Sequence, residues 1–149
     1  MHRIMFVCHG NICRSTMAQF VFEDLVRKAG REDEFIVDSA ATSREEIGNP
    51  PHHGTVSKLR EVGVPIGRHR ARQIARAEYD DWDHIVYMDG ENEHGLMRIL
   101  GGDPQGKCSR LLDFAGANRD VADPWYTGDF DATYRDVLAG CTALLDQLA

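Results

Sequence analysis

Cys8 and Arg14 are separated by five residues, and this spacing suggests nucleophilic chemistry on an anion. The apolar run 3–7 precedes the pair, and the amphipathic stretch 17–28 follows it. A short turn from a strand end into a helix start points several backbone N–H groups at one centre, which binds a tetrahedral oxyanion. The helix N-terminus and the guanidinium of Arg14 add positive charge there, and these fields favour the thiolate of Cys8. The spacing predicts a sulfur nucleophile inside an anion-binding loop.

The residues inside this loop suit a tight turn. Gly10 is expected to adopt backbone conformations that other residues avoid, and Asn11 tolerates left-handed geometry. Ser15 or Thr16 is expected to cap the following helix, and a hydroxyl near the sulfur would stabilise a departing thiolate. An isolated motif of this kind is more often a buried thiol near a solvated arginine. Here, however, strand, turn and helix follow in the order that an anion site requires.

Length and composition limit the protein class. A chain of 149 residues fits one domain, residues 1–149. No segment resembles a signal peptide or a membrane span, and the mean hydropathy is −0.41, so we expect a soluble cytoplasmic protein without membrane contact. The net charge of −7 argues against nucleic acid as a partner. The four cysteines form no CxxC pair and no zinc spacing, which favours reduced thiols without a bound metal.

Apolar periodicity predicts strands that alternate with helices. Strands are expected at residues 3–7, 35–37, 84–88 and 108–112, and helices at residues 17–28, 56–62, 91–100 and 130–148. Such alternation predicts an α/β fold, a parallel sheet with helices on both faces. Ligands of these sheets bind beyond the carboxyl ends of the strands, which is where Cys8 falls. The turn-rich segment 39–54 is expected to form one wall of the site.

A carboxylic acid is the second group that this chemistry needs. Displacing a phosphate ester leaves an alkoxide or phenoxide, which must receive a proton on the side opposite Cys8. Asp123 is the candidate, because Pro124 stiffens the backbone after it and the rings of Trp125 and Tyr126 are placed to flank a flat substrate. Asp-Pro is also a common turn opener, with Trp125 packed against the core, and the local sequence leaves both interpretations open.

Five blocks of the chain resemble the low-molecular-weight protein tyrosine phosphatases, in the order of that family. They are residues 7–15, 37–43, 69–74, 87–89 and 122–126. The resemblance implies a flavodoxin-like fold with four parallel strands in the order 2-1-3-4 between layers of helices. It also implies hydrolysis of phosphotyrosine and small aryl phosphates through a phosphocysteine. Cys8 would be the nucleophile, Arg14 the phosphate clamp and Asp123 the general acid and base, with no cofactor or metal.

The resemblance also implies residues that support the loop. Asn11, Ser15, Ser39 and His69 are expected to form a hydrogen-bond network that holds it in shape. A second interpretation of His69 is a solvated position in the basic run 68–72.

The remaining loop residues are expected to bind phosphate or to line the pocket. These are His9, Gly10, Ile12 and Cys13. Cys13 either forms a reversible disulfide with Cys8 under peroxide or is a small buried apolar residue. His9 either lines the pocket rim or is solvated.

Two positions depart from the family pattern. Glu45 stands where relatives place an aromatic wall, and its carboxylate is expected to disfavour acidic flanks around a phosphotyrosine and to favour basic or small substrates. Thr16 replaces the usual proline after the loop serine, a minor change at a helix start. Trp125 and Tyr126 complete the expected substrate rim, although exposed aromatic residues also mediate weak self-association. We expect a monomer.

Three other functions fit parts of the pattern. Related arsenate reductases use further cysteines near the third strand, and residues 82–101 contain none. Related arginine phosphatases place threonine where this chain has Ile12, so phosphoarginine hydrolysis is the second enzymatic hypothesis. A phosphopeptide-binding module would need Arg14 but neither Cys8 nor Asp123. The expected partners are therefore phosphotyrosine-containing proteins, with phosphate, vanadate and tungstate as inhibitors.

Overall fold

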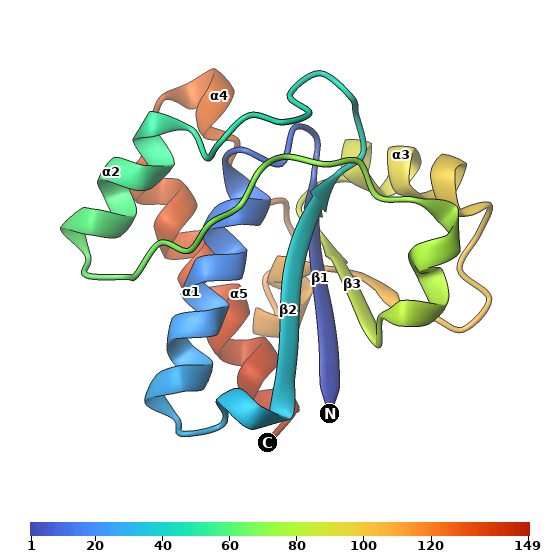
Figure 1. The fold of residues 1–149 in the computed structure, drawn as a ribbon, viewed down its shortest axis with the longest axis horizontal. Coiled ribbons are helices and arrows are strands. Elements are labelled where there is room, and N and C mark those ends of the chain that lie inside the picture. Colours follow the sequence, from blue (N-terminus) through green and yellow to red (C-terminus); the bar gives the residue numbers. More distant parts are fainter.

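Four parallel strands form one sheet at the centre of the computed structural model, which describes residues 1–149 (Figure 1). The order in the sheet is β2-β1-β3-β4, which confirms the order that the family resemblance implied. β1 therefore lies inside the sheet, between β2 and β3, and every strand pair is parallel. The strands are β1 His2–Cys8, β2 Phe35–Ala41, β3 His84–Tyr87 and β4 Cys108–Arg110.

Helices cover both faces of this sheet, as the alternation of elements predicted (Figure 1). On one side, α1 Arg14–Lys28 packs against β2 and against α5 Phe130–Gln147, and α2 His53–Glu61 contacts both helices. On the other side, α3 Gly90–Leu100 packs against the 3-10 helix η2 Arg76–Asp81. None of the helices is long and apolar enough to span a membrane. The remaining short elements are α4 Pro124–Thr127, η1 Glu32–Glu34 and η3 Leu111–Ala115.

The side chains of β1 contribute to the core on both faces of the sheet. Residues 4–7 have no exposed surface, and alternate residues of a strand point to opposite faces. Ile4 and Phe6 belong to the apolar cluster under α1 and α5, whereas Met5 and Val7 belong to the cluster under α3. Because β1 is packed from both sides, its carboxyl end has a defined position.

The fourth strand is shorter than the predicted span 108–112. β4 ends at Arg110, and Leu111 and Leu112 open η3 instead. A strand would direct two successive leucines to opposite faces. The helical turn buries both in the same cluster, beneath α5, with exposed fractions of 0% and 1%. Burial of both side chains on one face thus ends the strand early.

Candidate active site

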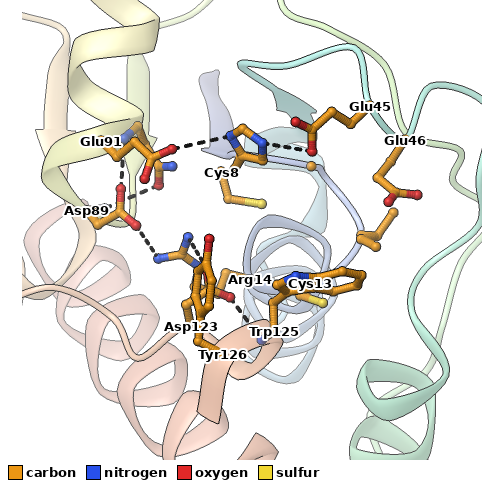
Figure 2. A pocket seen from close by; sticks show the side chains of 14 residues that line it. Cys8, Cys13, Arg14, Glu45, Glu46, Asp89, Glu91, Asp123, Trp125 and Tyr126 are labelled. Carbon is orange, nitrogen blue, oxygen red and sulfur yellow. Dashed lines mark hydrogen bonds and ion pairs between the residues drawn. The ribbon is translucent and has the colours of Figure 1, made fainter. Parts of the chain in front are cut away.

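A pocket of about 330 Å³ opens at the carboxyl end of β1 (Figure 2). The loop that joins β1 to α1 forms its floor, and its walls come from the β2–α2 segment, the start of α3 and the region of α4. The predicted nucleophile, phosphate clamp and general acid lie in this one pocket. The lining residues are Cys8, His9, Gly10, Ile12, Cys13, Arg14, Glu45, Glu46, Asp89, Glu91, Asn92, Asp123, Trp125 and Tyr126.

The sulfur of Cys8 lies against Ser15, in the first turn of α1. The Ser15 backbone N–H donates to Sγ over 3.4 Å, and the Ser15 Oγ lies 3.0 Å from the same sulfur. Ser15 therefore does not cap α1, because its hydroxyl is directed to the sulfur. The expected cap by Ser15 or Thr16 is wrong: Cys13 holds the cap position without a side-chain bond, and Thr16 Oγ1 donates back to the Cys13 carbonyl at 3.0 Å.

Asn11 joins the loop to β2. It is the only non-glycine residue with a positive φ, 60°, which agrees with its expected left-handed tolerance, and it is fully buried. Its Nδ2 donates to Ser15 Oγ at 2.8 Å and to Ser39 Oγ at 2.9 Å. Its Oδ1 accepts from His69 Nε2 at 2.7 Å. These bonds hold the unusual backbone of Asn11 in place, so the loop is shaped before a substrate enters.

His69 is buried within this network, with 8% of its side chain exposed, and is not solvated in a basic turn. Burial lowers its pKa, although the nearby Asp38 opposes the shift, so the ring is neutral at pH 7 and binds Asn11 as an Nε2–H donor.

Gln19 was not foreseen from the sequence. It accepts from Ser39 Oγ at 2.6 Å, and the only available signal was a polar residue on the buried face of α1.

Gly10 has a spatial role and not the conformational one that we expected. Its φ lies outside the left-handed region, unlike that of eight other glycines in the chain. A Cβ at this position would lie 3.3 Å from the Cγ of Glu46. The absence of a side chain at Gly10 thus lets the segment after β2 approach the loop.

Arg14 is held by two carboxylates. Its guanidinium is 3% exposed, with Nη1 2.8 Å from Asp89 Oδ2 and Nη2 3.2 Å from Asp123 Oδ2 (Figure 2). Burial alone would lower the pKa of Arg14, but Cys8 and the two carboxylates outweigh it and raise the pKa. Asp89 was not among the predicted site residues. The sequence signal for Asp89 was its position at the end of a predicted strand, just before a predicted helix. In the structure it caps this helix, α3, by accepting from the Asn92 backbone N–H at 2.7 Å.

Asp123 both opens a turn and lines the pocket, so the two interpretations of the sequence do not exclude each other. Its Oδ1 accepts from the Trp125 backbone N–H at 3.1 Å and so opens the short helix α4, while its Oδ2 faces Arg14 in the pocket. Trp125 and Tyr126 are 62% and 82% exposed. Trp125 therefore lines the pocket and is not packed into the core, and the two rings form an aromatic wall opposite the glutamates.

The other three cysteines are held as thiols. Burial raises the pKa of Cys13 to about 12, with further contributions from Cys8 and Asp123. Burial also raises the pKa of Cys108 to about 12 and that of Cys141 well above its usual value. All four cysteines are free. The sulfur of Cys8 accepts from the Ser15 backbone N–H in the first turn of α1.

Comparison with known proteins shows which family the chain belongs to. Residues 3–149 match the family model of the low molecular weight phosphotyrosine protein phosphatases. The chain is 42% identical over 144 residues to the low molecular weight protein-tyrosine-phosphatase YfkJ of Bacillus subtilis, covering 95% of this chain and 92% of that protein. It is 35% identical over 151 residues to the human low molecular weight phosphotyrosine protein phosphatase, covering 97% and 94% of the two chains.

Solved structures show the same similarity. The crystal structure of Bacillus subtilis YfkJ has a TM-score of 0.95 at 41% identity, covering 99% of this chain and 94% of that one. The low molecular weight protein tyrosine phosphatase of Streptococcus pyogenes has a TM-score of 0.90 at 36% identity, covering 100% and 94%. The chain therefore belongs to the low molecular weight phosphotyrosine protein phosphatase family and is a protein tyrosine phosphatase.

Proposed function

We propose that this enzyme hydrolyses phosphotyrosine in proteins through a phosphocysteine formed on Cys8. One observation supports this most directly: the Cys8 sulfur, the Arg14 guanidinium and the Asp123 carboxyl line one pocket. The exposed ring of Trp125 beside Asp123 suits a flat phenol as leaving group.

In the first step, the Cys8 thiolate attacks phosphorus in line with the leaving oxygen. The S–P bond forms, the P–O bond to the phenol breaks, and protonated Asp123 gives its proton to that oxygen. Arg14 and the loop N–H groups stabilise the equatorial oxygens of the transition state. Asp89 positions Arg14 for this task through its 2.8 Å bond.

In the second step, water attacks the phosphocysteine. Asp123, now ionised, takes a proton from the water as the P–O bond forms and the S–P bond breaks. The departing thiolate receives hydrogen bonds from the Ser15 N–H and hydroxyl; the hydroxyl proton is available because Ser15 Oγ accepts from Asn11. The products are tyrosine and inorganic phosphate, and the thiolate of Cys8 is restored.

The decisive experiment compares wild type with Cys8→Ser. The variant should release no phosphate from a phosphotyrosine peptide yet still bind vanadate or tungstate, because the loop donors remain. Full activity of Cys8→Ser would exclude the mechanism.

Parallel assays with phosphoarginine and phosphoserine peptides test the substrate class. Phosphotyrosine should be preferred, because the pocket wall offers the apolar side chain of Ile12.

A further inference from the structure

Three glutamates surround one side of the pocket mouth, and we call them the acidic rim. Glu45 and Glu46 lie in the segment between β2 and α2, and Glu91 lies in the first turn of α3 (Figure 2). The side chains of Glu45 and Glu91 are 69% and 76% exposed, so they meet a substrate outside the phosphate loop. Glu45 and Glu46 are neighbours in the sequence, whereas the fold brings Glu91 to the same pocket mouth.

Nearby arginines do not neutralise the acidic rim. Arg14, the only arginine in the pocket wall, is already paired with Asp89 and Asp123. Arg44 is adjacent to the rim in sequence, but its Nε donates to Gln73 Oε1 at 3.1 Å and it does not line the pocket.

His9 lies between two of the rim glutamates. Its Nε2 is 3.0 Å from Glu45 Oε2 and its Nδ1 is 3.7 Å from Glu91 Oε1. One imidazole carries at most one positive charge, so it cannot balance two carboxylates. Glu46 has no cationic partner and accepts from the Asn49 side-chain amide at 2.6 Å. The rim therefore keeps an excess of negative charge at the place where a substrate enters.

We propose that the acidic rim selects phosphotyrosine sites that carry lysine or arginine next to the phosphotyrosine. This inference rests on the proposed function, because a phosphoryl group in the loop brings the flanking residues to the pocket mouth. The loop attracts the phosphate at the pocket floor, whereas the rim repels an acidic flank and attracts a basic one. Complementary charge at a partly exposed contact mainly raises the association rate and the specificity.

The test uses three phosphotyrosine peptides that differ only in their flanks, which are lysine and arginine, alanine, or aspartate and glutamate. We expect kcat/KM to fall in that order. The span, which is the ratio of kcat/KM for the basic peptide to that for the acidic peptide, should be roughly tenfold at low salt, since each exposed charge pair contributes only a small factor. The span should shrink as salt is added, because the Debye length decreases from about 30 Å at 0.01 M to about 3 Å at 1 M. Equal values for the three peptides, or a preference for acidic flanks, would overturn the inference.

Variants assign the preference to the rim. Glu45→Lys combined with Glu91→Lys should invert the order of the peptides. Glu32→Lys makes the same type of charge change at an exposed site in η1, and it should leave the order as in wild type. If the double variant is misfolded by circular dichroism, Glu45→Gln replaces it and should reduce the span by roughly half. A wild-type span in the folded rim variant would overturn the inference.

A substrate without flanks separates this inference from the proposed function. p-Nitrophenyl phosphate reports on the chemical steps alone. If it is hydrolysed and the three peptides are equivalent, the rim inference fails and the proposed function stands. If neither it nor any peptide is hydrolysed, both fail.

Discussion

Nη1 of Arg14 donates to Oδ2 of Asp89 over 2.8 Å, and the arginine side chain is almost fully buried. The other oxygen of the same carboxylate, Oδ1, caps α3 by accepting from the Asn92 backbone N–H. One side chain thus orients the guanidinium of Arg14 and begins the helix beside it. Because each oxygen of Asp89 has its own partner, a change at Asp89 affects the position of Arg14 as well as the start of α3.

Asp89→Asn should lower kcat/KM for p-nitrophenyl phosphate by about tenfold to a hundredfold. A displacement of the Arg14 guanidinium by about 1 Å is enough to reduce the rate by such a factor. The amide retains an oxygen for the helix cap but provides no charge for Arg14. Asp80→Asn, at an exposed position without a side-chain partner, is the matched control and should match wild type. A value for Asp89→Asn within twofold of wild type would show that Asp123 and the Val121 carbonyl suffice to hold the guanidinium.

Iodoacetamide should modify Cys8 first at pH 7. The thiolate is the reactive form, and burial holds the pKa of Cys13 and of Cys108 at about 12, so both remain thiols. Peptide mass spectrometry after brief treatment measures the extent at each cysteine, and inorganic phosphate in the loop should protect Cys8. Cys108 is the most exposed of the other cysteines, and labelling of Cys108 as fast as Cys8 would contradict the prediction.

Peroxide should produce a disulfide between Cys8 and Cys13. Both residues line the same pocket, and a sulfenic acid on Cys8 condenses with a neighbouring thiol before further oxidation. Activity lost to peroxide should therefore return with dithiothreitol in wild type and not in Cys13→Ala. If mass spectrometry finds no 8–13 crosslink, Cys13 is only a small buried residue of the first helical turn.

Folding stability should decrease as the pH falls from 7 to 5. Burial lowers the pKa of His52, His69 and His84 from the ordinary 6.5, so below this pH the unfolded chain binds more protons than the folded one. The stabilisation is thus complete above pH 6.5 and is lost on acidification. Urea unfolding midpoints across this range measure the slope.

His52 provides a specific test of this slope. Its Nδ1 accepts from the Gly54 backbone N–H at 3.0 Å and caps α2, a bond that protonation of Nδ1 abolishes. His52→Asn keeps a capping acceptor that does not titrate, so the slope should become shallower. His94→Asn changes an exposed histidine and should leave the slope unchanged. An unchanged slope in His52→Asn would exclude His52 as a contributor.

The loop could be predicted because its signals are local, whereas the order of the strands came from the resemblance to the family. Cys8 and Arg14 are close in sequence and lie between a strand and a helix, so their meeting follows from short-range geometry. Asp89 is 75 residues from Arg14, and no pattern in one sequence tells which of 24 acidic residues faces a given arginine. The end of β4 was missed for a similar reason, because α5, far along the chain, decides where Leu111 and Leu112 are buried.

Gly140→Ala should destabilise the fold, although alanine favours helices by about 1 kcal/mol over glycine. A Cβ at this position in α5 would lie 2.4 Å from the Cγ of the buried Leu111, and overpacking of this kind costs about 1–3 kcal/mol. Gly90→Ala is the control, because its Cβ meets nothing within 4 Å and should be neutral or slightly stabilising. Urea midpoints compare the two. If Gly140→Ala were as stable as wild type, η3 would have to yield to the added methyl group, and Leu111 would not be tightly packed against α5.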